Sequence, residues 1–259
     1  MSFDFDPDRL DRRAPALIAG VLPWLQTFSR RYLRLRVAGV ENIPRDPTMF
    51  VANHNGGIMG PDLFCTLPLL WDALGPDAPL YALAHDFAMR QVVPLGALLQ
   101  RAGAIAASRL NAARVFAMGG SVLVYPGGDL DAYRPYHRRD EVVVLPRSGF
   151  IDVARAADVA IVPIVAQGAH RSAYVLSEGR DLARWLRLHR WARVERFPIA
   201  LALPWGIALG PWLPYFPLPF QVKLRVLPAI RFTPDVESSI AAAHVESVMQ
   251  AAMHEMRAS

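Results

Sequence analysis

The sequence is short of cysteine, of lysine and of long uninterrupted apolar runs. Cys65 is the one cysteine in 259 residues, which excludes an intrachain disulfide and any zinc site built from cysteines. Lys223 is the one lysine, beside 27 arginines. Because 53% of the residues are hydrophobic and mean hydropathy is +0.20, the chain can bury a substantial core and is not intrinsically disordered. We predict a folded protein without a metal site.

Two apolar stretches carry no charge, and both are poor membrane-spanning helices. Residues 14–29 include Pro23 and number 16, whereas a spanning helix needs about 20 residues. Residues 197–222 number 26, but six prolines interrupt them. The aromatic rings of this second stretch are typical of a lipid–water boundary, and a buried strand with a loop is the alternative. We predict an amphipathic, interfacial helix within residues 1–32 and no regular transmembrane helix.

The arginines concentrate in two segments. Residues 30–45 hold five arginines and one glutamate, and residues 180–196 hold six arginines, one aspartate and one glutamate. Arginine binds phosphate through its planar fork, so lipid headgroups and nucleic acids both fit, and a solvated basic face is the simplest alternative. Tryptophans within the second segment favour an anionic membrane surface. We therefore predict a membrane lipid partner and no nucleic acid.

The N-terminal residues indicate the cellular location of the protein. Asp4, Asp6, Asp8 and Asp11 make this region acidic, which is wrong for a secretory signal. We therefore predict no signal peptide and a peripheral or monotopic position at the cytoplasmic face of a membrane.

Strand-like and helix-like segments alternate along the chain. Short β-branched or apolar runs predict strands at residues 33–37, 49–53, 80–84, 122–125, 160–165 and 222–227. Helical spacing predicts helices at residues 87–91, 94–102, 112–118, 149–157 and 238–256. This alternation predicts an α/β fold with a largely parallel sheet flanked by helices. No linker divides the chain, so we expect one domain over residues 1–259, with an N-terminal segment (1–32), an α/β core (33–232) and a C-terminal helix (233–259).

A histidine, two glycines and a carboxylate follow the second predicted strand. The sequence from Val51 reads Val-Ala-Asn-His-Asn-Gly-Gly-Ile-Met-Gly-Pro-Asp, so His54 precedes Asp62 by eight residues. In α/β folds, sites form where strands end in glycine-rich loops. A neutral histidine can take a proton from a hydroxyl if a carboxylate holds its other ring nitrogen, although a lone loop histidine is more often structural. The loop residues Asn55, Gly56 and Gly57 would let a substrate and its oxyanion approach the backbone.

Two further motifs place charge after predicted strands. In Gly-Ala-Ile-Ala-Ala-Ser-Arg109 the arginine stands before a helix, where it can bind phosphate or form a surface salt bridge. In Tyr-Pro-Gly127-Gly128-Asp129, followed by Arg134, a buried strand breaks at a turn. Such a turn offers backbone donors for an oxyanion, or is a plain tight turn.

A fourth motif, residues 159–170, is a predicted strand with an internal proline. Pro163 lies within Val-Ala-Ile-Val-Pro-Ile-Val-Ala-Gln-Gly-Ala-His. A proline inside a strand indicates an edge strand, a bulge or the end of the strand.

Taken in order, the four motifs resemble the four sequence blocks of the lysophosphatidate-acyltransferase-type glycerolipid acyltransferase superfamily. The resemblance covers about residues 35–230. It implies an acyltransferase of the glycerolipid-acyltransferase fold that uses acyl-CoA or an acyl-carrier-protein thioester as cosubstrate and needs no cofactor. It assigns His54 as the catalytic base, Asp62 as its charge partner, and Pro163 as the block-four proline. The substrate-binding residues that we infer are Arg109, Gly127, Gly128, Asp129 and Arg134.

The sequence departs from the family pattern in two places. Seven residues separate His54 from Asp62, where the family has four, and Gly127-Gly128-Asp129 stands where the family has Glu-Gly-Thr. The resemblance as a whole implies transfer of a fatty acyl group to a lyso-glycerolipid hydroxyl. Acylation of a neutral lipid alcohol (mono- or diacylglycerol, or a fatty alcohol) is the first alternative. A non-catalytic lipid-binding protein on the same fold is the second.

Overall fold

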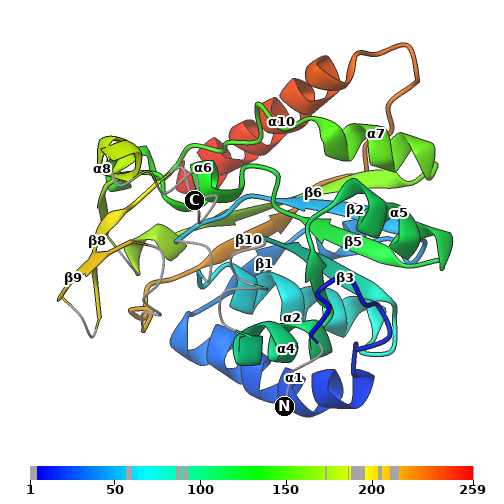
Figure 1. Cartoon of the computed structure of the whole chain (residues 1–259), viewed down its shortest axis with the longest axis horizontal. Coiled ribbons are helices and arrows are strands. Elements are labelled where there is room, and N and C mark those ends of the chain that lie inside the picture. The colour runs from blue at the N-terminus through cyan, green and yellow to red at the C-terminus, as the bar shows by residue number, and fades with distance from the viewer. Residues whose placement is uncertain are drawn as a thin grey trace.

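A mostly parallel sheet forms the centre of the protein (Figure 1). The computed structural model describes residues 5–56, 60–85, 89, 93–172, 174–185, 187, 196–203, 206–210 and 216–258. In these residues seven strands form the main sheet, in the order β1-β10-β6-β2-β5-β3-β4. They are β1 (Arg36–Ala38), β2 (Thr48–Ala52), β3 (Leu80–Ala84), β4 (Ala104–Ala106), β5 (Ser121–Val124), β6 (Ala160–Gln167) and β10 (Lys223–Val226). Strands β2 to β6 run parallel and β10 is antiparallel to β6, so the predicted α/β fold is confirmed.

Helices cover both faces of the main sheet (Figure 1). One face carries α1 (Pro15–Thr27), α2 (Leu63–Leu74) and α4 (Val93–Arg101), and the other carries α5 (Arg109–Ala117), α7 (Gly149–Ala156) and α10 (Ser238–Ala258). Side chains alternate along β2, so Phe50 packs with residues of α1 and α2 while Met49 and Val51 pack with residues of α5, α7 and α10. A strand buried on both faces needs a continuous apolar run, which is how β2 reads in the sequence.

A second, smaller sheet projects from the main one (Figure 1). It is antiparallel and consists of β7 (Tyr174–Ser177), β8 (Ile199–Ala202) and β9 (Gly206–Leu209), with the short helix α8 (Arg180–Trp185) between β7 and β8. Leu201, Ile207 and Leu209 are 45%, 65% and 51% exposed. The apolar stretch 197–222 therefore contains a hairpin that leaves large apolar side chains open to solvent.

Several predicted elements differ from the structure. The strand expected at 33–37 begins only at Arg36, because Leu33 closes the helical turn Phe28–Tyr32 and Arg34 adopts a left-handed conformation. Helix α2 was not predicted, since it contains Pro68 and has few polar residues to mark a solvent face. The helix predicted at 87–91 lies outside the described residues except for Met89.

Pro163 lies in a central strand, so the edge-strand interpretation is wrong. Strand β6 has β2 on one side and β10 on the other. The ladder between β6 and β10 ends at the Ile164–Val226 pair, and pairing resumes only at the bridge between Ile161 and Ile230. The interruption falls where Pro163 has no N–H to donate, and its carbonyl still accepts from Leu227 (2.9 Å).

The predicted N-terminal helix is present as α1, which packs against α2. Trp24 on this helix is 78% exposed, and Ile18 is buried. No helix in the described part of the chain combines the length and the apolarity that crossing a bilayer requires.

Candidate active site

His54 and Asp62 form a buried pair at the carboxyl edge of the main sheet. His54 follows β2, and Asp62 precedes the first turn of α2. The His54 Nδ1 atom lies 3.2 Å from Asp62 Oδ2, and the two residues are 7% and 0% exposed. The long His54–Asp62 spacing therefore still brings the two side chains together. Burial raises the pKa of the Asp62 carboxyl, and its contact with His54 opposes this shift.

A buried ion pair holds the backbone of His54 on both sides. Asp131, in the short helix α6 (Gly128–Ala132), accepts the His54 N–H and pairs with Arg134. Arg134 Nη2 in turn donates to the His54 carbonyl (3.2 Å). Burial raises the pKa of Asp131 to about 6, although Arg134 lowers it. Both polar groups of the histidine backbone are thus fixed by the loop that follows β5.

Arg134 was predicted to bind substrate, and the structure contradicts this role. Its side chain is fully buried, and it lines neither of the two cavities that reach His54. Its donors are used on Asp131, on the His54 carbonyl and on carbonyls of the following turn. Arg134 is therefore a positioning residue for His54.

The ring of His54 is fixed by stacking as well as by Asp62. Tyr125, immediately after β5, stacks on it with ring centroids 4.1 Å apart and an interplanar angle of 14°. With Nδ1 directed at Asp62, the Nε2 atom is the one left for a substrate. Tyr125 and His54 both line the two cavities described next.

An apolar cavity of about 330 Å³ reaches the histidine from the face covered by α1, α2 and α4. Its walls are mostly aliphatic and aromatic, from Leu17, Val21, Leu67, Trp71 and Leu98 among others. A cavity with this lining is suited to a hydrocarbon chain.

A second cavity, here called the Arg109 pocket, reaches the same histidine from the face covered by α5 and α7. It measures about 430 Å³, and its charged lining includes Arg109 and Arg147. Arg109 begins α5 immediately after Ser108, whose hydroxyl caps the helix by accepting the Asn111 N–H (3.0 Å). The Arg109 side chain is 70% exposed and lies 3.4 Å from Asp152. The structure thus brings Arg109 and His54 to one pocket.

The glycine turn after β5 lies between the two cavities. Gly128 lines both of them, and a Cβ on Gly127 would collide with the carbonyl of Val143. Asp129 lines the apolar cavity and accepts from Arg147 Nη2 (2.9 Å). Gly127 itself serves close packing, whereas Gly128 and Asp129 line cavities that reach His54.

Asn55 does not point toward His54's cavities, contrary to its predicted place in an oxyanion loop. Its side chain is fully buried, with Oδ1 accepting the His170 N–H (2.8 Å) and Nδ2 donating to the Arg139 carbonyl (3.5 Å). Gly56 has a positive φ of 102° and packs against Ala169. Gly57 lies outside the described residues.

Sequence reasoning missed three residues of this site: His85, Asp131 and Arg147. His85 follows β3 and lines both cavities, and a histidine after a parallel strand was a signal that could have found it. Arg147 follows an irregular loop, so no pattern pointed to it. Among the described residues, no group of three or more histidine, cysteine, aspartate or glutamate side chains is placed to hold a metal ion.

Comparisons with known proteins agree with this architecture. The chain is 29% identical over 197 residues to uncharacterized proteins of Mycobacterium tuberculosis and Mycobacterium bovis, which covers 73% of this chain and 55% of each relative. A Mycobacterium leprae protein is 27% identical over 198 residues, or 53% of its length. The chain thus spans about half the length of the curated relatives it matches.

A solved structure shares the fold. It is the crystal structure of PlsC, a 1-acyl-sn-glycerophosphate (LPA) acyltransferase from Thermotoga maritima, with a TM-score of 0.54 and 16% sequence identity over 92% of this chain and 81% of that chain. A family model described as Acyltransferase matches residues 34–167, which include His54, Asp62, Arg109 and the Gly127–Gly128 turn. The chain therefore belongs to this acyltransferase family.

Proposed function

We propose that the protein is an O-acyltransferase that moves a fatty acyl group from a thioester to the hydroxyl of a lyso-glycerolipid. The observation that carries the proposal is the position of His54, which is held by Asp62 and lies where an apolar cavity meets an arginine-lined pocket. One cavity suits the acyl chain, the other suits an anionic group, and the base lies between them.

The chemistry needs one base and no covalent intermediate. His54 Nε2 takes the proton of the acceptor hydroxyl, while the hydroxyl oxygen attacks the thioester carbonyl carbon. The C–O bond forms, the C–S bond breaks, and the proton passes from the imidazolium to the leaving thiolate. Asp62 fixes the ring with Nε2 free and stabilises the transient positive charge on the imidazole.

The lining of the two cavities supports a place for the acyl chain and a place for an anionic group. The acyl-CoA or acyl-carrier-protein thioester is a cosubstrate, and its acyl chain occupies the apolar cavity. Arg109 and Arg147 bind the anionic portion of a substrate in the Arg109 pocket. A neutral lipid alcohol is the alternative acceptor, because the glutamate of the family's third block is replaced here by Gly127.

The second sheet supplies a surface for membrane lipid. Leu201, Ile207 and Leu209 alternate on one face of the β8–β9 hairpin, and the register pairs Leu201 with Ile207. Trp185, at the end of the neighbouring α8, is 78% exposed, and Arg184 beside it is 75% exposed. Apolar side chains next to tryptophan and arginine suit an anionic bilayer surface, where substrates of this class reside.

The decisive experiment measures thiol release from acyl-CoA with a panel of acceptors: lysophosphatidate, monoacylglycerol and a fatty alcohol. We expect the His54→Ala variant to lose about 10²–10⁴-fold in kcat/KM. His137→Ala is the matched control, because His137 is exposed and lines neither cavity. Full activity in His54→Ala would exclude the mechanism, and lipid binding without thiol release would favour the non-catalytic alternative. A preference for the uncharged acceptors would select the neutral-alcohol alternative.

A further inference from the structure

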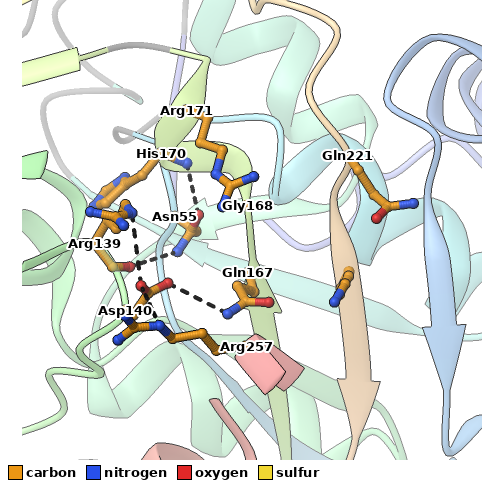
Figure 2. Close-up of a pocket in the computed structure, with 10 residues that line it drawn as sticks. Asn55, Arg139, Asp140, Gln167, Gly168, His170, Arg171, Gln221 and Arg257 are labelled. Atoms are coloured by element: carbon orange, nitrogen blue, oxygen red, sulfur yellow. Dashed lines mark hydrogen bonds and ion pairs between the residues drawn. The ribbon is translucent and has the colours of Figure 1, made fainter. Parts of the chain in front are cut away.

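The loop that presents His54 also forms the wall of a separate, polar pocket. His54 lines the two cavities described above, whereas Asn55, the next residue, lines a pocket of about 150 Å³ between the end of β6 and the end of α10. Figure 2 shows this space, here called the α10 pocket, with side chains from β6, β10 and α10 around it. None of its lining residues has a role in the acyl transfer proposed above.

The α10 pocket is strongly cationic. Its lining includes four basic side chains and one carboxylate: Arg139, Arg171, Lys223, Arg257 and Asp140. Four positive charges and one negative charge leave a net charge of +3. A small pocket with this charge attracts a multivalent anion.

The single carboxylate contacts two of these cations and offsets one of the four positive charges. Asp140 lies 3.7 Å from Arg139 Nε and 4.0 Å from Arg257 Nε, and it accepts from Gln167 Nε2 (3.4 Å) (Figure 2). It thereby holds two of the arginines beside the pocket. Arg171 is exposed and forms no ion pair within the described part of the chain.

A buried histidine in the same pocket has no hydrogen-bond partner for its ring. His170 is 2% exposed, and among the described residues neither Nδ1 nor Nε2 has a partner, although its backbone N–H donates to Asn55. Burial, reinforced by Arg134, His54 and Arg139, holds the pKa of His170 well below its usual range. A neutral imidazole has one N–H to donate, and leaving such a buried donor unused is unfavourable. Both ring nitrogens are closed off from the pocket, so a ligand bound there does not reach them.

We propose that the α10 pocket binds a phosphate group. An arginine guanidinium group binds two phosphate oxygens at once through two parallel N–H donors, and three arginines line this pocket. A water needs roughly 10–15 Å³ of such space, so a pocket of about 150 Å³ has room for a phosphate group and several waters. The remainder of a larger ligand extends past the exposed Arg171. The proposal stands on this pocket alone and is independent of the acyl-transfer chemistry.

The test is titration calorimetry of the whole chain with inorganic phosphate at constant ionic strength, with acetate as the monovalent comparison. We expect a dissociation constant for phosphate of about 1 mM or tighter. The double variant Arg171→Gln with Arg257→Gln should bind phosphate at least tenfold more weakly. Arg45→Gln with Arg101→Gln is the matched control, since both arginines are exposed and lie outside the pocket. No phosphate binding, equal binding of acetate, or equal loss in both double variants overturns the proposal.

Competition then identifies the source of the phosphate. Adenosine 3′,5′-bisphosphate represents a soluble nucleotide, and glycerol 3-phosphate represents a lipid headgroup. Tighter binding of one of them than of inorganic phosphate assigns the site to that class, and equal binding assigns it to free phosphate. His54→Ala should bind phosphate as the unsubstituted chain does. In the unsubstituted chain, phosphate binding without acyl transfer would reject the proposed function and keep this site, whereas acyl transfer without phosphate binding would do the reverse.

Discussion

The two sheets use similar sequences for opposite purposes. Strand β2 of the main sheet reads Thr-Met-Phe-Val-Ala, and every residue in it is buried. Strand β9 of the second sheet reads Gly-Ile-Ala-Leu, and only Ala208 is buried. Helices cover both faces of the main sheet, whereas Ile207 and Leu209 of the second sheet remain exposed among the described residues. Whether an apolar strand is buried or exposed therefore depends on the elements that pack on it, and the sequence of the strand alone does not show this.

The largest expected difference between the sheets is in stability. Phe50→Ala should lower the free energy of unfolding by about 3–5 kcal/mol, because Phe50 is fully buried and its removal leaves a cavity. Ile207→Ala should change it by about 0.5 kcal/mol or less, since Ile207 is 65% exposed. Urea unfolding measures both. Equal losses would mean that the second sheet is also a packed core.

The next effect concerns the buried charges behind His54. Asp131→Asn should lower the free energy of unfolding by about 3–5 kcal/mol, because it leaves Arg134 buried without its anionic partner. The control is Asp158→Asn, which breaks the exposed contact between Asp158 and Arg231 (3.0 Å) and should cost at most about 1 kcal/mol. Thermal unfolding compares the two variants. Equal midpoints would show that the Asp131–Arg134 pair contributes no more than a surface pair.

A smaller effect concerns membrane binding. Ile207→Glu should weaken binding to anionic phospholipid vesicles about tenfold, since a charge replaces a side chain whose full burial contributes about 1.5–3 kcal/mol. Ile240→Glu is the matched control: Ile240 is 60% exposed, but it lies on α10. Vesicle co-sedimentation gives the partition coefficients. Equal weakening by both substitutions would show that the second sheet has no specific role in membrane binding.

The smallest expected effect is the modification of the thiol of Cys65, which lies on α2 and is buried. Burial raises the pKa of its thiol to about 12, so little reactive thiolate forms at neutral pH. Iodoacetamide should leave the folded protein unmodified over hours and should add one group per chain in urea, as mass spectrometry would show. Rapid modification of the folded protein would mean that α2 opens readily.

The sequence predicted the candidate site residues that follow strand ends. It did not predict the contacts between loops that are distant in sequence and meet only in the fold. The ends of β2, β4 and β5 could be located from local patterns, and they bring His54, Arg109 and Gly128 to adjoining cavities. Asp131 and Arg134 could not be assigned, because their contacts are with the backbone of His54, many residues earlier in the chain. A side chain's type shows what it can bind, and only the fold shows what it does bind.

The second sheet and the direction of Asn55 were unpredictable for a related reason. Strands β8 and β9 lie in a stretch rich in proline and aromatic residues, where an interfacial segment and an ordinary hairpin have the same pattern. The sequence allowed the Asn55 side chain to face either the substrate or the protein. In the fold it faces the protein, because its Oδ1 atom accepts the backbone N–H of His170.

The place of β10 in the main sheet has a consequence for how the chain folds during synthesis. Lys223 of β10 pairs with Arg36 of β1 and with Gln167 of β6, so a late segment is inserted between two early ones. Until the ribosome has released β10, β1 has no neighbour in the sheet and that side of β6 is an open edge, which can pair with other chains. Pairing across such a long sequence separation is slow. The nascent chain should therefore expose this edge of β6 until β10 has emerged.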